Sequence, residues 1–380
     1  MPTIFDLQST DDPRDIVHHT AQALIEGQVV AIPTDTVYGL AAHALCEDAV
    51  ERLCEIKGRS NTAPLAISVR SRDAAGDLFG KLSPVARRLS HRCWPGPMTL
   101  VLPCDSSQSA AQQLPKSTRE RITGDGGCIG FRVVDHRILS YIHRFLAAPL
   151  VLTSANISGN PAPTTAEGVV EQLGDEIPQL LDDGPTRYGG ASTVVRVQGD
   201  RWEMLREGVI ERAAMNQFVK PVIAIVCTGN TCRSPMAEAL LREQVRTKFG
   251  SEDAVRVLSA GVAAGQGSGA SPQSVEVMGK RGLDLTGHSS QQLSDNLMNV
   301  ADLVLTMTRG HRAAILAAWP NMHERVFTLR RDGGDISDPV GMPVDVYEDC
   351  ATQIDGELAV WLDNLDDDFF PQHVSRGGDS

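Results

Sequence analysis

An uninterrupted apolar run, residues 222–226 (VIAIV), stands directly before the nine residues CTGNTCRSP (227–235). Five apolar residues in a row are typical of a strand that is buried on both faces of a parallel sheet. Pro235 favours the first turn of a helix, because the backbone N–H that proline lacks has no helical partner there. This segment therefore predicts a strand, a tight loop and a helix that begins at Pro235.

The remainder of the C-terminal half continues the alternation of strands and helices. Further apolar runs lie at 255–258, 303–305 and 326–329, and each follows a stretch with helical periodicity. Strands that alternate with helices predict a doubly wound parallel sheet in an α/β fold.

The N-terminal half has a less regular α/β pattern. Strand-like runs at 29–32, 151–152 and 194–197 are separated by helical patterns such as 84–91. Mixed strands and helices predict a second α/β domain. Residues 105–127 are rich in Ser, Gln and Gly, and we expect them to form a long loop.

The length of 380 residues suggests two domains. We expect one domain over 12–210, a linker over 211–220 without strong periodicity, a second domain over 221–365, and a disordered tail over 366–380. No apolar run approaches the roughly 18 residues of a membrane span, and the N-terminus lacks the features of a secretory signal. A soluble cytoplasmic protein without membrane contact is the expectation.

Charge and cysteine usage narrow the function classes. The net charge is −13 and aromatic residues make up 4% of the chain, which speaks against a dedicated nucleic-acid binder. Residues 51–150 carry 15 Lys and Arg against 8 Asp and Glu, or +7, so weak RNA binding stays open. The eight cysteines form no CxxC pair and no zinc-finger spacing, so no metal site is predicted.

The loop after residues 222–226 can bind an anion. Backbone N–H groups at a helix start point toward one spot, and the positive end of the helix dipole adds to the attraction. Gly229 and Asn230 can adopt the left-handed conformations that a tight loop needs. Cys227 lies close to the helix dipole and to Arg233, and both favour the thiolate, the nucleophilic form. Arg233 can hold two phosphate oxygens, and Ser234 can donate a hydrogen bond to the sulfur; a buried cysteine in a glycine turn is the alternative.

A phosphate-transfer reaction at this loop also needs an acid for the leaving group. Asp338-Pro339 lies in the polar segment 335–339, after the last predicted strand. In a doubly wound sheet such a loop returns to the carboxyl edge, over the anion-binding loop. Asp338 is therefore a candidate general acid, and a plain Asp-Pro turn is the alternative.

The C-terminal half resembles the low-molecular-weight protein tyrosine phosphatases over roughly 220–365. The matching stretches are CTGNTCRSPMAEAL (227–240), LSAGV (258–262), Gly282 to His288, ADLVLTMTRGH (301–311) and SDPVG (337–341). The resemblance implies that Cys227 is the nucleophile, that Arg233 binds phosphate and that Asp338 is the general acid, with no cofactor. It implies a phosphate-binding loop of Thr228, Gly229, Asn230, Thr231, Cys232 and Ser234, in which Cys232 can trap Cys227 as a reversible disulfide.

Two positions bear on the phosphoprotein substrate. Thr231 stands where tyrosine-specific members usually carry a larger aliphatic residue, and bacterial protein-arginine phosphatases resemble the sequence there. Val340 stands where family members usually have an aromatic residue. Phosphotyrosine and phosphoarginine both stay open, and we expect a modest preference for phosphoarginine.

The N-terminal half carries a series of short polar motifs at predicted strand and helix ends. They are PTDTVYGL (33–40), Lys57-Gly58-Arg59 with Pro64-Leu65, WPGPMT (94–99), Arg132, TSANISG (153–159), Asp183-Gly184 with Ser192-Thr193-Val194, and LREG (205–208). Two cations such as Lys57 and Arg59 suit a polyphosphate. Taken singly, each motif could equally be a turn, a cap or a solvated surface.

In this order the motifs resemble the YrdC-type threonylcarbamoyl-AMP synthases, over about 12–210. The family fold is a twisted, mostly mixed sheet with helices. The family reaction combines L-threonine, bicarbonate and ATP into threonylcarbamoyl-adenylate and pyrophosphate, for a tRNA-modifying complex that makes N6-threonylcarbamoyladenosine at position 37. The resemblance implies that ATP, with Mg²⁺, is held by Lys57, Arg59, Ser154, Asn156 and Arg206. It implies that L-threonine is held by Thr34, Arg132 and Ser192.

The sequence thus predicts a bifunctional enzyme, a nucleotidyltransferase joined to a cysteine-dependent protein phosphatase. One alternative is an active synthase joined to a catalytically weak phosphatase-fold binding module, because Val340 departs from the family pattern. Another is an RNA-binding protein that uses residues 51–150.

Overall fold

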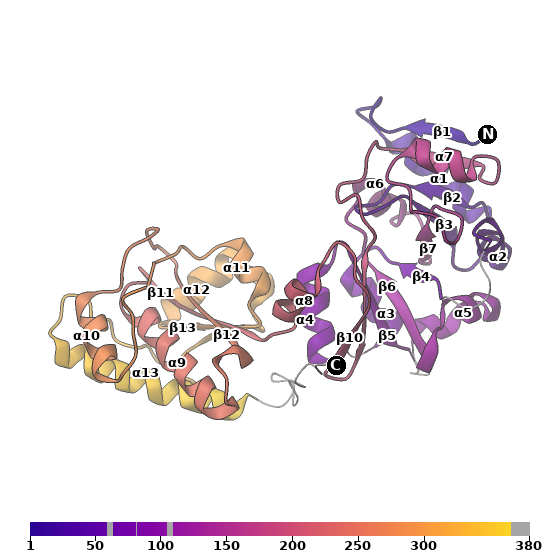
Figure 1. The fold of residues 1–380 in the computed structure, drawn as a ribbon. Coiled ribbons are helices and arrows are strands. Elements are labelled where there is room, and N and C mark those ends of the chain that lie inside the picture. Colours follow the sequence, from indigo (N-terminus) through magenta and orange to yellow (C-terminus); the bar gives the residue numbers. More distant parts are fainter. Residues whose placement is uncertain (59–63, 81, 105–108, 366–380) are drawn as a thin grey trace. The chain divides into compact units, whose positions relative to one another are not determined.

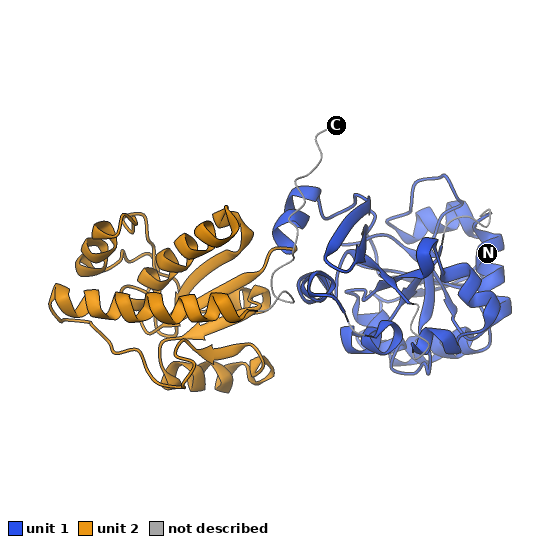
Figure 2. Cartoon of the chain, turned by 90° about the horizontal axis from the view of Figure 1, so that it is seen from below, with its two compact units in different colours: residues 1–218 blue, residues 219–380 orange. Residues whose placement is uncertain are grey.

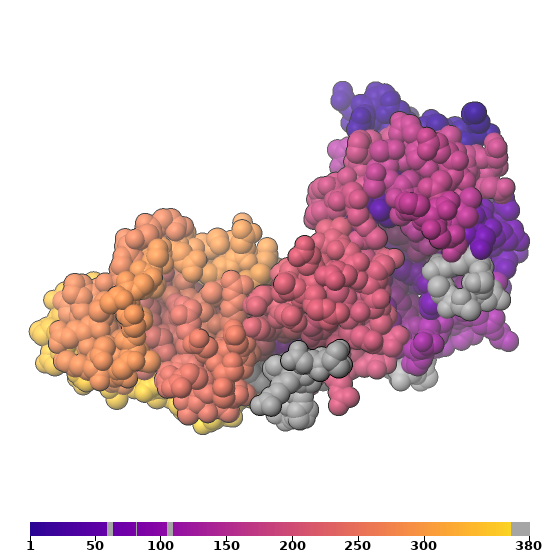
Figure 3. Space-filling model, in the orientation of Figure 1, coloured from indigo at the N-terminus to yellow at the C-terminus, as the bar shows by residue number. Residues whose placement is uncertain are grey.

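The structure is a computed structural model that describes residues 1–58, 64–80, 82–104 and 109–365. The chain divides into two compact units, residues 1–218 and residues 219–380 (Figure 2). Figure 3 shows one face of the chain as a space-filling model, coloured along the sequence. In the described part of the chain, no helix is both long enough and apolar enough to cross a membrane. The expected disordered tail, 366–380, lies outside the described residues.

Unit 1 is built on a mixed sheet of ten strands in the order β1-β8-β2-β3-β7-β4-β6-β5-β9-β10 (Figure 1). The strands are β1 (Thr3–Asp6), β2 (Val30–Ile32), β3 (Gly39–His43), β4 (Ala66–Ser68), β5 (Met98–Pro103), β6 (Cys128–Arg132), β7 (Leu150–Ser154), β8 (Gln179–Asp182), β9 (Thr193–Gln198) and β10 (Arg201–Arg206). Parallel pairs such as β4 with β6 alternate with antiparallel pairs such as β3 with β7. The prediction of a mixed sheet with helices is confirmed.

The helices of unit 1 lie in the connections between its strands, except α8, which follows β10. They are α1 (Arg14–Ile25), α2 (Glu47–Ile56), α3 (Arg72–Phe79), α4 (Pro84–Cys93), α5 (Lys116–Ile122), α6 (Arg137–Ile142), α7 (Ala166–Leu173) and α8 (Arg212–Phe218), with 3₁₀ turns η1 (Ala110–Gln113) and η2 (Asp125–Gly127). One core cluster joins α1 and α6 to strands β2, β3 and β7 through fully buried aliphatic residues, including Leu24, Ile142 and Leu150.

Two segments of unit 1 differ from the sequence expectation. Residues 109–127, expected to be a loop, contain α5, while 105–108 lie outside the described residues. Helix α5 buries only Thr118 and Ile122, four residues apart, and so short an apolar face gives little periodic signal. The expected linker, 211–220, contains α8, which is anchored by the single buried side chain of Met215.

Unit 2 is a doubly wound parallel sheet, as predicted, in the strand order β12-β11-β13-β14. Its strands are β11 (Val222–Cys227), β12 (Arg256–Gly261), β13 (Leu303–Thr306) and β14 (Val326–Thr328). Its helices are α9 (Arg233–Phe249), α10 (Pro272–Lys280), α11 (Asp295–Val300), α12 (Arg309–Ala318) and α13 (Val344–Asn364), with 3₁₀ turns η3 (Glu252–Ala254) and η4 (Pro320–Met322).

Strand β11 is buried on both faces, which explains its continuous apolar sequence. Ile223 and Ile225 pack against α9, α10 and α13 on one face. Ala224 and Val226 pack against α11 and α12 on the other. Because β11 lies between β12 and β13, Cys227 at its carboxyl end stands where connections leave to opposite faces, the place where such sheets bind ligands.

Candidate active sites

The loop of unit 2 connects β11 to α9, which begins at Arg233, two residues earlier than predicted. Pro235 still lies in the first turn, where backbone N–H groups need no helical partner. Of the two residues expected to be left-handed, only Asn230 is so, with φ 55°, whereas Gly229 has no positive φ. The tight turn is therefore made by an Asn whose side chain is held in place.

Cys227 is 3% exposed and its sulfur has two close polar neighbours. Its Sγ lies 2.9 Å from Ser234 Oγ and accepts from the backbone N–H of Asn230 over 3.2 Å. Asn230 Nδ2 donates to Ser234 Oγ over 2.9 Å and to Ser259 Oγ over 2.8 Å. Since Asn230 already donates to the Ser234 oxygen, the hydroxyl hydrogen of Ser234 can point either to the sulfur at 2.9 Å or to the carbonyl of Ala260 at 3.4 Å, and the shorter contact suits a thiolate.

Arg233 and Asp338 come together at the mouth of this loop. Arg233 is 4% exposed, and its Nη1 donates to the carbonyl of Ile336 over 3.0 Å. Its Nη2 donates to Asp338 Oδ2. Asp338 Oδ1 accepts from the backbone N–H of Val340 over 3.2 Å. The segment after β14 thus returns over the loop, as a leaving-group acid requires.

Residues outside the motif support the remaining loop positions. Thr228 Oγ1 lies 2.9 Å from Nε2 of His311, a histidine whose pKa is lowered by burial and by Arg233. The carbonyl of Thr231 accepts from the backbone N–H of Ser271 over 2.8 Å. Cys232 Sγ lies 3.5 Å from the hydroxyl of Tyr347. Neither His311 nor Tyr347 was predicted as a site residue; they are 83 and 115 positions from the loop residues that they contact.

In unit 1 the predicted ligand residues line one cavity of about 810 Å³. The predicted ligand residues that line this cavity are Thr34, Lys57, Arg132, Ser154, Asn156, Ser192 and Arg206. Most stand at strand ends, where the polar backbone and side chains leave the sheet. Arg59, the remaining predicted ligand of ATP, lies outside the described residues.

Lys57 and the Ser154–Asn156 turn form a compact polar cluster in this cavity. Lys57 caps the C-terminus of α2, and its Nζ donates to Ser154 O over 2.7 Å and to Asn156 Oδ1 over 2.8 Å. Ser154 Oγ donates to Asn156 Oδ1 over 2.6 Å. Lys57 is only 4% exposed, so its charge is held in a fixed place inside the cavity.

A second cluster lies where β9 and β10 form one edge of the sheet. Arg206, at the end of β10, donates from Nη2 to Ser192 O over 2.8 Å and to Ser192 Oγ over 3.0 Å.

Thr34 Oγ1 donates to the carbonyl of Val37 over 2.6 Å, which folds the segment after β2 into a turn.

Arg132, at the end of β6, is held by residues that follow β2. Its Nη2 donates to Asp35 Oδ1 over 2.6 Å and to Thr36 Oγ1 over 2.8 Å. Burial lowers the pKa of Arg132, and Asp35 opposes this shift. Asp35 was not predicted as a site residue, although it stands between Thr34 and Thr36 in the first motif.

Comparison with known proteins now assigns both units. Residues 22–208 match the Sua5_yciO_yrdC family model, which carries the description "Telomere recombination". Residues 222–370 match the family model of low molecular weight phosphotyrosine protein phosphatases. The chain belongs to both families. It is a Sua5-type domain fused to a low molecular weight phosphatase domain, and the predicted resemblances are confirmed.

Relatives support each half separately. A threonylcarbamoyl-AMP synthase of Bacillus subtilis is 36% identical over 219 residues, 58% of this chain and 60% of the synthase. A protein-arginine-phosphatase of the same organism is 39% identical over 137 residues, 35% of this chain and 89% of the phosphatase. A solved variant of Sua5 from Pyrococcus abyssi is 23% identical, covers 92% of this chain and 96% of its own, and has a TM-score of 0.51, which shows likeness of fold.

The Sua5-type relatives are longer than the matched part. The chain spans 60% of the Bacillus subtilis synthase and 47% of a Pyrococcus abyssi synthase. In this chain the phosphatase domain follows the Sua5-type domain.

Proposed function

We propose that unit 1 makes threonylcarbamoyl-AMP from L-threonine, bicarbonate and ATP. The observation that carries this is the single cavity in which Lys57, Ser154 and Asn156 face the same space as Thr34 and Arg132. A volume of about 810 Å³ suits a nucleotide with an amino acid beside it, since ligand sites span roughly 300–1,000 Å³.

The chemistry requires two bond-forming steps. The amine of L-threonine attacks the carbon of bicarbonate, whose hydroxyl leaves as water with a proton of the amine, to give a carbamate. An oxygen of the carbamate then attacks the α-phosphorus of ATP as pyrophosphate leaves. Arg132 would hold the carboxylate of threonine, and Lys57 and Arg206 would hold phosphate oxygens as charge-assisted partners. The chain thereby brings three reactants together in fixed orientation, which is a large part of the rate gain.

Mg²⁺ would accompany ATP rather than occupy a protein cage. In the described ranges, no group of three or more His, Cys, Asp or Glu side chains could hold a metal ion. Mg²⁺ commonly keeps several waters and binds substrate phosphates, and it would neutralise charge on the triphosphate.

The test for unit 1 is pyrophosphate release by the purified chain. Release should require ATP, L-threonine and bicarbonate together. ATP hydrolysis that is indifferent to L-threonine would contradict the proposal.

For unit 2 we propose phosphoprotein hydrolysis through a phosphocysteine. The sulfur of Cys227 would form a bond to phosphorus as the bond to the leaving group breaks, and Asp338 would donate its proton to that group. Water, deprotonated by Asp338, would then release phosphate and return the thiolate. The contact between Cys227 Sγ and Ser234 Oγ at 2.9 Å supports this reading, because the hydroxyl stabilises the thiolate as it leaves phosphorus.

The residues at the rim of this site favour a substrate whose phosphate is attached to an aliphatic side chain over one with an aromatic ring. Val340 and Met342, which follow Asp338, are 64% and 47% exposed. Neither offers an aromatic face on which a phenol ring could stack. Together with Thr231 in the loop, this supports phosphoarginine as the preferred substrate, with phosphotyrosine as the alternative.

Turnover of a generic aryl phosphate separates an enzyme from the alternative of a phosphatase-fold binding module. The native chain should hydrolyse it, and Cys227→Ser should not, because a serine hydroxyl at neutral pH is a far weaker nucleophile than a thiolate. No turnover by the native chain would favour the binding module.

The proposed partners follow from the two reactions. The product of unit 1 would serve a tRNA-modifying complex that forms N6-threonylcarbamoyladenosine at position 37, in the cytoplasm. Weak RNA binding by the basic stretch 51–150 is a second candidate property, and its affinity should fall with salt.

A further inference from the structure

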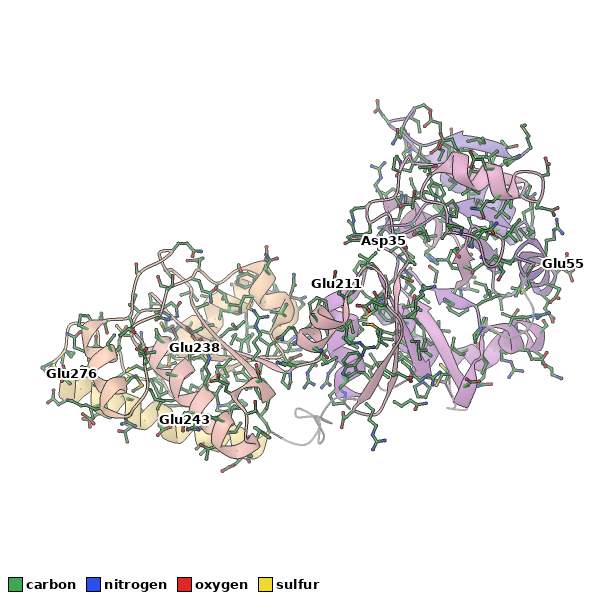
Figure 4. All side chains as sticks on the ribbon, viewed as in Figure 1. Asp35, Glu55, Glu211, Glu238, Glu243 and Glu276 are labelled. Atoms are coloured by element: carbon green, nitrogen blue, oxygen red, sulfur yellow. The ribbon has the colours of Figure 1, made fainter. Side chains whose placement is uncertain are left out.

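Four titratable side chains, one of which lines the cavity, stand at the ends of different elements of unit 1. Arg132 ends β6, Asp35 follows β2, Asp183 follows β8, and His136 stands immediately before α6. Figure 4 labels Asp35 within unit 1. Arg132 lines the cavity, whereas Asp35 and His136 are not among its lining residues.

The inner pair is Arg132 with Asp35, whose side chains are 7% and 0% exposed. Asp35 Oδ1 accepts from Arg132 Nη2 over 2.6 Å. Asp35 Oδ2 is buried and has no hydrogen-bond donor among the described residues. A buried carboxylate oxygen without a donor is costly, by roughly 1–3 kcal/mol or more for a charged group, so a missing partner is indicated.

The outer pair is His136 with Asp183, joined by 3.2 Å between Nε2 and Oδ2. A carboxylate only accepts, so Nε2 carries the hydrogen and Nδ1 of the neutral ring is a bare acceptor. Nδ1 is also buried, and no described residue is within hydrogen-bond reach of it. A proton on Nδ1 would create a new donor at this position.

The two unpartnered atoms belong to side chains that influence each other. Burial lowers the pKa of His136, whereas Asp183, Asp35 and Asp135 raise it. The cations beside these carboxylates are Arg132 and Arg187, which pairs with Asp135 over 2.7 Å. A proton on Nδ1 would therefore place a positive charge next to a group of three carboxylates, one of which, Asp35, has a buried oxygen without a donor among the described residues.

We propose that Asp35 and His136 are positioning residues of the amino-acid site: Asp35 fixes the guanidinium of Arg132, and His136 takes up a proton when a carboxylate binds to that guanidinium. This inference rests on the proposed function of unit 1. The carboxylate of the bound zwitterion brings a negative charge to Arg132, close to Asp35, Asp135 and Asp183, and the proton on His136 offsets that local charge. Nη1 of Arg132 donates to no described residue, so it is available to the incoming carboxylate.

The sign of the pH dependence follows from this linkage. A bound carboxylate favours protonated His136, so its pKa is higher in the complex than in the free chain. The affinity for L-threonine is then greatest below the free pKa and falls as pH rises through the pKa of the complex.

The test is calorimetric titration of the full chain with L-threonine, in two buffers of different ionisation heat, between pH 6 and 8. The native chain should take up a fraction of a proton per bound threonine. His136→Gln should lose at least nine-tenths of that uptake and bind with an affinity independent of pH. Asp35→Asn should bind at least tenfold more weakly at every pH. His143→Gln is the matched control, because His143 contacts Ser68 and not Asp35.

A further variant keeps the test decisive if Asp35→Asn fails to fold. Asp183→Asn removes the partially exposed outer carboxylate, which should shift the fall in affinity to lower pH without abolishing it. Proton uptake that persists in His136→Gln, or an unshifted pH profile in Asp183→Asn, would overturn the inference alone. Absence of threonine binding by the native chain would instead overturn the proposed function of unit 1, and the inference with it.

Discussion

Arg233 Nη2 donates a hydrogen bond to Asp338 Oδ2, so the residue proposed to bind phosphate and the residue proposed to protonate the leaving group are paired with each other. Arg233 is buried at 4% side-chain exposure, while Asp338 is 44% exposed. An incoming phosphate must therefore take the place of the carboxylate on the guanidinium. The displaced carboxyl would then be free to face the leaving group.

Asp338→Asn should separate these two roles. Aryl-phosphate turnover should fall by about 10²–10⁴-fold, the usual contribution of general acid catalysis. The loss should be smallest for leaving groups that depart readily without a proton. Binding of tungstate should become tighter, because the competing carboxylate is gone. Equal losses for good and poor leaving groups would rule out Asp338 as the acid.

Lys57→Ala should nearly abolish threonine-dependent pyrophosphate release. A charge-assisted hydrogen bond contributes about 1.5–3 kcal/mol, equivalent to roughly 10–150-fold in rate. The thermal unfolding temperature should also drop, since Ser154 O and Asn156 Oδ1 lose their shared donor. Lys116→Ala, at a lysine that is 83% exposed, is the control and should behave as the native chain. Robust turnover by Lys57→Ala would remove Lys57 from the ATP site.

Thr231→Ile should reverse the substrate preference of unit 2. The side chain of Thr231 leaves room for a guanidinium and offers it a hydrogen-bond partner. The longer aliphatic side chain of isoleucine would instead pack against a phenol ring. A change of this size is worth about 1–3 kcal/mol of discrimination, or 10–200-fold. The measurement is mass-spectrometric hydrolysis of matched phosphoarginine and phosphotyrosine peptides. A native chain that prefers phosphotyrosine, with a ratio unchanged by Thr231→Ile, would establish tyrosine specificity.

His143 should make unit 1 less stable in mild acid. Burial lowers the pKa of His143 to about 4, and its Nε2 lies 3.1 Å from Ser68 Oγ. The unfolded chain binds this proton near pH 6.5, so stability is complete above that pH and declines as pH falls toward 4. The shift corresponds to about 3 kcal/mol. Denaturant unfolding at pH 7 and pH 4.5 should show this decline in the native chain and a smaller one in His143→Gln.

Much of the phosphatase site could be predicted because its parts are neighbours in the chain. Strand, loop and helix start occupy one segment, and its conformation depends on residues within a few positions of each other. The left-handed turn at Asn230 and the placement of Cys227 beside Ser234 are of this kind. Even here, the start of α9 at Arg233 was not predicted from the sequence, because a proline is equally acceptable at several positions of the first turn.

The sequence by itself determined the two α/β units, the anion-binding loop and the polar residues of the cavity, because apolar periodicity and short motifs are local properties. Only the tertiary structure decided which charges meet. The pairing of Arg132 with Asp35 spans 97 positions and that of Arg233 with Asp338 spans 105. Such pairs depend on the order of the strands in the sheet. The importance of Asp35 and His136 comes from their burial, which makes an unpaired polar atom costly, and burial of this kind cannot be predicted from a local sequence pattern.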